Sequence, residues 1–70
     1  MQLINNVIEE CAELTQALCK AQKHGWWNYH PERPTSSNYE ETLHEMEDVI
    51  EAIEKLNVYM RQLCYEHYKN

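Results

Sequence analysis

Residues 39–68, YEETLHEMEDVIEAIEKLNVYMRQLCYEHY, decide the fold of this chain. Side chains at a spacing of three and four run through the whole stretch: Leu43, Met46, Ile50, Ile53, Asn57, Met60 and Cys64. This spacing is typical of one face of an α-helix. A parallel row of Val49, Leu56 and Leu63 widens that face, and no proline or glycine interrupts it. The pattern therefore predicts one long helix over about 39–68.

The residues just before this stretch are suited to start a helix. Ser37 is followed three places later by Glu40, and Asn38 is followed three places later by Glu41. A Ser or Asn with Glu at this spacing is a helix N-terminus signal, because the two residues can satisfy each other's free backbone amides. We expect Ser37 or Asn38 to cap the second helix.

The first part of the chain has the same periodicity. Apolar residues step by three and four at Ile4, Val7, Cys11, Leu14 and Leu18. This predicts a helix over about 2–23, with Gly25 as its C-terminal stop. Both prolines and a Thr-Ser-Ser-Asn cluster fall in the connection over about 24–38. We therefore predict an all-α fold in which residues 1–70 form a single helical domain, a two-helix antiparallel hairpin.

Composition limits the partners and the location. Twelve acidic against six basic residues give a formal charge of -6, which repels a phosphate backbone, so no nucleic-acid polymer is expected to bind. No apolar run is long enough for a membrane span, so no membrane partner is expected either. The three cysteines form no CxxC pair and no charged-then-apolar leader precedes them. From these features we predict that the protein is cytoplasmic.

Two helices alone leave apolar surface uncovered. The apolar face of the second helix spans about 180°, which is wider than one neighbouring helix covers. A two-helix core of this size roughly balances the entropy lost on folding. We expect a homo-oligomer, a dimer or tetramer, in which hairpins join into a four-helix bundle or a larger assembly. Cys11 and Cys64 are expected to be small core residues in these seams.

Each predicted helix carries a pair of carboxylates three residues apart. They are Glu10 with Glu13, and Glu45 with Asp48. Residues at this spacing share one helix face, with roughly 5 to 6 Å between Cβ atoms, so both can bind one hard cation. In an antiparallel hairpin the numbers of facing residues have a constant sum, which is 58 for Glu10 with Asp48 and also for Glu13 with Glu45. Four carboxylates are therefore expected to meet between the helices.

Acidic residues on a helix more often form a solvated face, which is the alternative interpretation. At about 100° per residue, Glu47, Glu51 and Glu54 do cluster on one side of the second helix. Glu45 instead lies in line with Val49 and Leu56. A carboxylate among core positions needs a partner, and a metal ion is the natural one because no basic residue lies at matching register.

The arrangement resembles the MazG-like superfamily of all-α nucleotide pyrophosphohydrolases, whose signature is EExxE followed by ExxD. The matching residues are Glu9, Glu10, Glu13, Glu45 and Asp48. The likeness extends over 10–20 and 45–53, and the chain looks like a short, minimal, phage-like member. The resemblance implies that Glu10, Glu13, Glu45 and Asp48 bind Mg²⁺, with Mn²⁺ as a substitute. Glu9 is then an auxiliary carboxylate that acts in catalysis with Glu10 and Glu13.

The same resemblance implies hydrolysis of a nucleoside triphosphate between the α and β phosphates, giving a monophosphate and pyrophosphate. Held magnesium neutralises phosphate charge, and a spare carboxylate can accept a proton. The alternative is a non-catalytic protein that binds and sequesters a nucleotide or a nucleotide messenger. A helical module with only an oligomerisation role is a third option, but it leaves Glu45 unexplained.

Five residues near the connection are candidates for substrate binding. Trp26 and Trp27 could stack on a base, or they could simply close the end of the hairpin. Lys20, Lys23 and Arg33 could contact phosphates, or they could be ordinary solvated cations favoured by a helix C-terminus.

Overall fold

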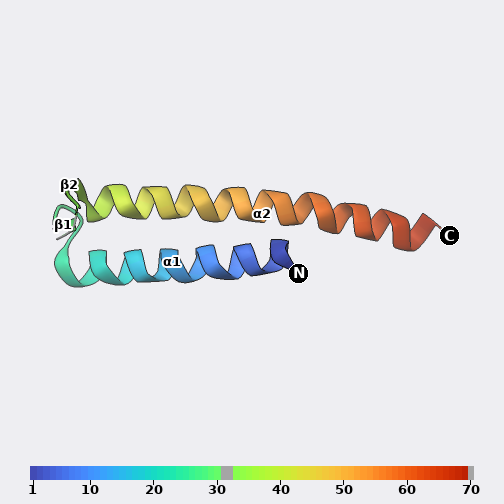
Figure 1. Cartoon of the computed structure of the whole chain (residues 1–70), viewed down its shortest axis with the longest axis horizontal. Helices are drawn as coiled ribbons and strands as arrows, with labels where there is room; N and C mark the ends of the chain where they lie inside the picture. Colours follow the sequence, from blue (N-terminus) through green and yellow to red (C-terminus); the bar gives the residue numbers. More distant parts are fainter. Residues whose placement is uncertain (31–32, 70) are drawn as a thin grey trace.

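The computed structural model describes residues 1–30 and 33–69, and its two helices lie side by side in antiparallel orientation (Figure 1). Helix α1 spans Gln2–His24 and helix α2 spans Asn38–Lys69. The predicted helical hairpin is therefore confirmed, and the predicted helix limits agree to within one residue. Helix α2 runs without interruption through Asn57, as its unbroken periodicity predicts.

Helix α1 ends at Gly25, the predicted C-terminal stop. Gly25 has a φ of 87°, in the region that side-chain-bearing residues rarely adopt. Its amide donates a hydrogen bond to the carbonyl oxygen of Ala21 at 2.7 Å. Lys23 and His24 occupy the last turn, where positive charge is favoured by the helix dipole.

The connection contains a small antiparallel ribbon that the sequence does not predict. Strand β1 (Tyr29–His30) pairs with strand β2 (Arg33–Ser37), with Ser37 opposite Tyr29 and an irregularity before the next pair. Backbone amides at the start of α2 donate to the turn between Gly25 and β1: Asn38 to the Asn28 carbonyl at 2.7 Å and Tyr39 to the Trp26 carbonyl at 2.8 Å. This turn therefore holds the first residues of α2 in place.

A side-chain cap completes the start of α2. The hydroxyl of Ser37 accepts a hydrogen bond from the amide of Glu40 at 3.2 Å, so Ser37 provides the cap that the sequence predicts. Asn38 instead begins the helix, and its side-chain amide donates to the carbonyl of Gly25 at 2.9 Å. Ser37 and Asn38 are both buried.

Removing this cap should destabilise the protein measurably. Ser37→Ala is expected to lower the free energy of unfolding by about 1 kcal/mol, because the Glu40 amide loses its acceptor. Ser37→Thr retains the hydroxyl and serves as the matched control. Urea unfolding followed by circular dichroism measures both variants. Equal stability of Ser37→Ala and the wild type would contradict a capping role.

The contact between the helices is narrow. Among the residues whose side chains the structure describes, the buried apolar ones are all small or medium-sized: Ala17, Ala21, Val49 and Ala52. The radius of gyration is 16.3 Å, against about 11 Å for a compact chain of this length. Helix α2 also continues past the N-terminus of α1 (Figure 1). The hairpin is therefore an extended rod with little interior.

The expectation that Cys11 and Cys64 are core residues is wrong within one chain. Both thiols are free and exposed. Cys64 lies on the part of α2 that extends past α1. Cys11 lies about 100° around α1 from Glu10, which is half-buried like Val7 and Leu14, so its side chain points sideways and not into the contact with α2. Within the described residues, neither helix is long and apolar enough to cross a membrane.

Candidate functional site

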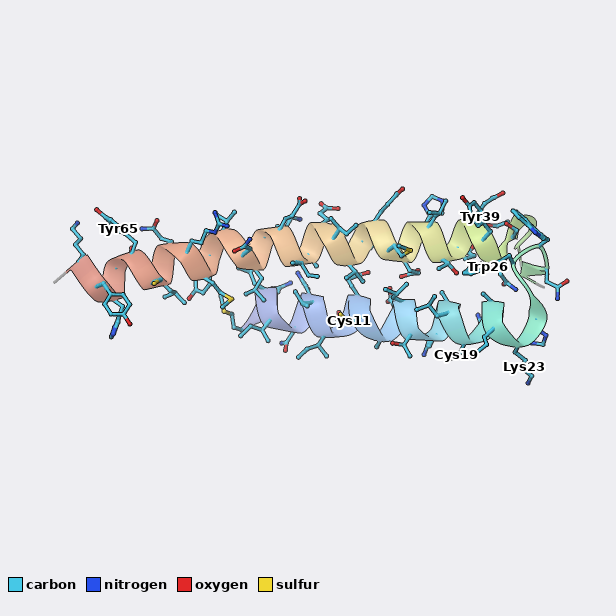
Figure 2. All side chains as sticks on the ribbon, turned by 180° about the vertical axis from the view of Figure 1, so that it is seen from behind. Cys11, Cys19, Lys23, Trp26, Tyr39 and Tyr65 are labelled. Carbon is cyan, nitrogen blue, oxygen red and sulfur yellow. The ribbon has the colours of Figure 1, made fainter. Side chains whose placement is uncertain are left out.

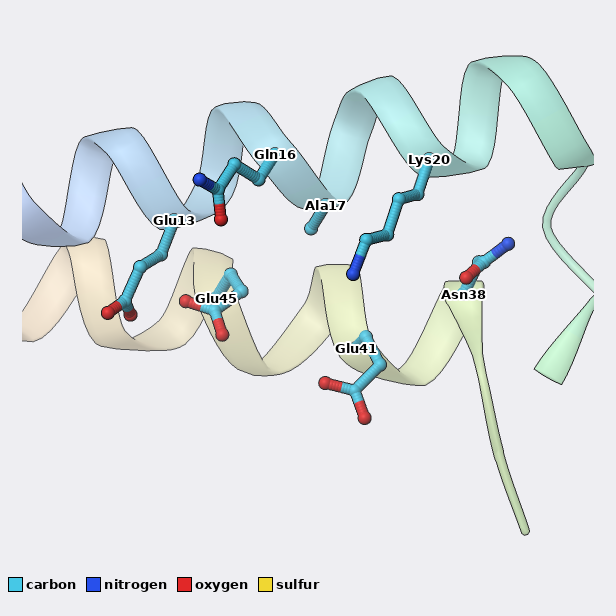
Figure 3. Close-up of a pocket in the computed structure, with 7 residues that line it drawn as sticks. All are labelled: Glu13, Gln16, Ala17, Lys20, Asn38, Glu41 and Glu45. Carbon is cyan, nitrogen blue, oxygen red and sulfur yellow. The ribbon is translucent and has the colours of Figure 1, made fainter. Parts of the chain in front are cut away.

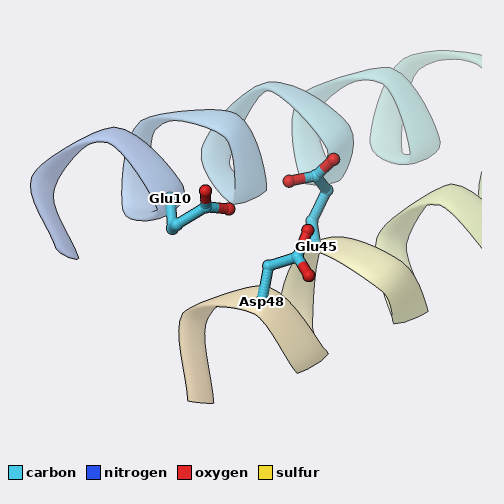
Figure 4. A group of neighbouring side chains, drawn as sticks. All are labelled: Glu10, Glu45 and Asp48. Carbon is cyan, nitrogen blue, oxygen red and sulfur yellow. The ribbon is translucent and has the colours of Figure 1, made fainter. Parts of the chain in front are cut away.

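Carboxylates from both helices meet between them at the predicted register. One oxygen each from Glu10 of α1 and from Glu45 and Asp48 of α2 all lie within 4.8 Å of one another. Figure 4 shows the three side chains extending into the space between the helices. Three of the four predicted metal ligands are thus brought together. The fourth, Glu13, is exposed beside them, and its charge acts on both Glu10 and Glu45.

Two of these carboxylates have an oxygen atom that makes no hydrogen bond. The Oε2 atoms of Glu10 and Glu45 are both shielded from solvent, and neither has a hydrogen-bond partner. Burial raises the pKa of both groups above the ordinary value of 4.5, and the charge of Glu13 raises the pKa of each further. Buried polar atoms without partners are uncommon in native proteins. The group therefore has oxygen atoms available to bind a hard cation.

Glu9 lies at the edge of this group. Its side chain is exposed, and its negative charge contributes to the raised pKa of Glu10. A solvent-facing carboxylate next to the triad is in contact with water. The structure thus places all three predicted catalytic carboxylates, Glu9, Glu10 and Glu13, on adjacent turns of α1.

A cleft of about 320 Å³ adjoins the triad on the side towards the connection. Its lining residues come from both helices and are Glu13, Gln16, Ala17, Lys20, Asn38, Glu41 and Glu45 (Figure 3). The side chain of Lys20 extends from α1 towards α2 across this cleft. The volume falls at the lower end of the range for small-molecule sites. Lys20 is the predicted phosphate-binding cation that shares a cleft with the carboxylates.

A second hollow of about 290 Å³ adjoins the other end of the triad. It is lined by Asn6, Glu10, Asp48, Glu51, Ala52 and Lys55. Lys55 pairs with Glu51 at 3.3 Å, and both side chains are mostly exposed. Sequence reasoning assigned no role to Gln16, and no motif in the sequence assigned one to Lys55. The available signal is spacing, because Gln16 follows Glu13 by three residues and Lys55 follows Asp48 by seven.

The two tryptophans occupy a different place. Trp26 and Trp27 line an apolar hollow of about 190 Å³ together with Tyr39, Leu43 and Met46. The rings of Trp27 and Tyr39 have centroids 5.2 Å apart and are tilted by 33°, and Trp26 meets Tyr39 edge-on at 6.3 Å. Figure 2 shows Trp26 and Tyr39 at the connection end of the hairpin. Of the residues that the structure describes, none lines both this hollow and the carboxylate cleft.

Of the two remaining substrate-binding candidates, Lys23 and Arg33, Lys23 is not part of the cleft lining. Lys23 is exposed in the last turn of α1. The side chain of Arg33 lies outside the described part of the structure.

Comparison of this chain with protein-family models, with curated proteins and with solved structures found no match.

Proposed function

We propose that this chain is a magnesium-dependent nucleoside triphosphate pyrophosphohydrolase. It would cleave the α–β phosphoanhydride bond of a ribo- or deoxyribonucleoside triphosphate to give a monophosphate and pyrophosphate. The observation that carries the proposal is the meeting of Glu10, Glu45 and Asp48 across the seam, with a shielded and unpartnered oxygen on two of them. The EExxE…ExxD resemblance supplies the reaction class.

The donor set fits magnesium. Every group in the triad offers carboxylate oxygen, which hard cations such as Mg²⁺ and Mn²⁺ prefer. Glu10, Glu45 and Asp48 would hold the ion, and Glu13 would complete the set from the adjacent turn. When bound, the ion supplies neutralisation of phosphate charge and polarises water for attack. Without it, clustered negative charge would repel a triphosphate, because the chain already has a formal charge of -6.

The chain's own residues have separable roles in this proposal. The exposed Glu9 carboxylate accepts the proton of the attacking water. Lys20, in the cleft next to Glu13 and Glu45, contacts the phosphate chain. Lys55 reaches phosphate oxygens from the opposite hollow once it leaves Glu51, a surface pair of the kind that contributes little to stability.

A second candidate function is nucleotide binding without cleavage. The observation in its favour is that Lys20 alone supplies a cation to the lining of the carboxylate cleft, among the described residues. Phosphoryl-transfer sites usually surround the phosphates with several positive groups. A site with one lysine and one metal could retain a nucleotide or nucleotide messenger without cutting it.

One assay separates these functions. The protein is incubated with each of the common nucleoside and deoxynucleoside triphosphates in the presence of Mg²⁺, and the products are resolved by ion-exchange chromatography. Hydrolysis predicts equal amounts of monophosphate and pyrophosphate, with little diphosphate. Intact nucleotide that co-elutes with the protein would favour sequestration. Release of diphosphate and inorganic phosphate would contradict the proposed bond specificity.

The proposal also includes the assembly and location expected from the sequence. We propose a homo-oligomer, because the hairpin buries too little apolar surface to be stable alone. We propose a cytoplasmic location, since nucleoside triphosphates are found there and the three free thiols are compatible with a reducing compartment.

A further inference from the structure

A continuous apolar surface covers one face of the hairpin. On α1, exposed side chains at helical spacing are Ile4, Ile8, Cys11 and Leu18. On α2, a longer exposed row consists of Tyr39, Leu43, Met46, Ile50, Ile53 and Met60. The aliphatic members are 41–61% exposed, although such side chains are normally buried. We call these two rows the apolar face.

Geometry places both rows on the same side of the hairpin. On α1, the row lies about 100° around the helix axis from the residues that contact α2. On α2, the row lies at a similar angle from the residues that contact α1. In both helices the rotation has the same direction when the helix is viewed from its own N-terminus. Because the helices run in opposite directions, equal rotations of this sense lead to the same side. By the same construction, Glu13 and Asp48 turn to the opposite side. The apolar face and the carboxylate cleft are therefore back to back.

The hairpin exposes more surface than a compact monomer of the same mass, by an amount on the scale of a standard interface. The chain has an accessible surface of 5800 Å², whereas a compact monomer of this mass has roughly 4,700 Å². The excess of roughly 1,100 Å² exceeds the roughly 800 Å² that each partner contributes to a standard protein–protein interface. No Asp, Glu, Lys or Arg belongs to either row, so two copies of this acidic chain can meet there without charge repulsion.

We propose that a second copy of this chain covers the apolar face, with the two connections at opposite ends of the resulting four-helix assembly. The interface is isologous, so a residue close to the two-fold axis meets its own copy. Cys11 lies at the midpoint of the α1 row, which spans residues 4–18. The midpoint of the α2 row, near residue 50, faces α1 within one turn of Cys11. The two-fold axis therefore passes close to Cys11. This proposal specifies the homo-oligomer proposed above and does not depend on the proposed catalytic activity.

The opposite-end arrangement follows from where apolar surface remains. Helix α2 extends past α1 by about 12 residues, or roughly 18 Å, and its row continues into that extension through Met60. With opposite ends, this extension lies along the partner's connection, over the hollow lined by Trp26, Trp27 and Tyr39. Methionine adapts well to such an irregular apolar hollow. With both connections at the same end, the extension would remain uncovered.

The first test measures the oligomeric state by sedimentation equilibrium. Ile50→Glu places a charge in the apolar face and is expected to weaken dimerisation at least a hundredfold. Val58→Glu is the matched control, because Val58 is 71% exposed on the same helix but lies off the row. It should dimerise like the wild type. A folded wild-type monomer at micromolar concentration, or equal weakening by both variants, would overturn the proposal.

The second test does not depend on a variant that might fail to fold. In a Cys19→Ser, Cys64→Ser background, a short bis-maleimide should link Cys11 to its copy and give a covalent dimer. In a Cys11→Ser, Cys64→Ser background, Cys19 should give at least tenfold less, because the two copies of Cys19 are about 24 Å apart along the axis. Efficient linkage through Cys19, or none through Cys11, would overturn the opposite-end arrangement.

Discussion

The substitution Glu45→Gln should lower the rate of triphosphate cleavage at least about a hundredfold, which is roughly 2.7 kcal/mol of transition-state stabilisation. Glu45 meets Glu10 and Asp48 between the helices and has a shielded oxygen without a partner. A neutral amide of nearly the same shape removes one charged ligand and leaves the packing intact. The measurement is kcat and KM for the best substrate found by chromatography, at saturating Mg²⁺.

Glu47→Gln is the matched control on the same helix. Glu47 is exposed and faces away from α1, whereas Glu45 is half-buried in the seam. Glu47→Gln should keep the wild-type rate. Without metal, Glu45→Gln should fold at least as stably as the wild type, because removing one of several crowded charges relieves repulsion. An equal loss of activity in both variants, or no loss in either, would contradict the proposal that Glu45 belongs to a metal-binding carboxylate site.

The helices and their register were predictable because local signals agreed with the tertiary contacts. Gly25 ends α1, Ser37 caps α2, and the constant sum of facing numbers brings Glu10 opposite Asp48. The β1–β2 ribbon was not predictable. Its pairing is short and irregular, and it has no alternation of apolar and polar side chains that a sequence pattern could reveal.

Periodicity alone also did not decide which row of α2 faces α1. Two rows lie on this helix, and the structure packs the one that contains Val49 and Ala52 while leaving Met46 and Ile50 exposed. Small side chains allow the helices to approach closely, so the narrower row fits the partner helix. This choice explains why Glu45, which is in line with Val49, lies in the seam.

The part of the site that depends on the register between α1 and α2 was predictable from the sequence. The part that depends on the conformation of the connection between the helices was not. The triad follows from spacing within two regular helices. The position of Trp26 and Trp27 follows instead from hydrogen bonds such as that from Tyr39 to the Trp26 carbonyl, which bring the segment next to the apolar face of α2. Trp26 and Trp27 do not line the carboxylate cleft of the same chain. The structure therefore gives no support to their stacking on a base bound in that cleft.

Magnesium should stabilise the folded protein by about 2 to 4 kcal/mol when its concentration is a hundred to a thousand times its dissociation constant. The ion would relieve repulsion among Glu10, Glu45 and Asp48, and it has no comparable site in the unfolded chain. Thermal or urea unfolding in Mg²⁺ and in EDTA measures the effect. Identical unfolding in both conditions would count heavily against a metal site, and calcium in place of magnesium tests whether the site distinguishes the smaller ion.

The pH dependence of this stabilisation distinguishes a bound ion from general screening of charge. In EDTA, the raised pKa values of Glu10 and Glu45 mean that the folded protein holds more protons than the unfolded chain above pH 4.5. Stability should therefore fall as the pH rises from that value through the raised pKa values. Magnesium binds the ionised groups, so its stabilising effect should grow over the same interval. Glu45→Gln removes one of the two titrating groups and should flatten both trends, whereas Glu47→Gln should preserve them. A magnesium effect that is independent of pH, or unchanged by Glu45→Gln, would show that the ion acts elsewhere on the acidic surface.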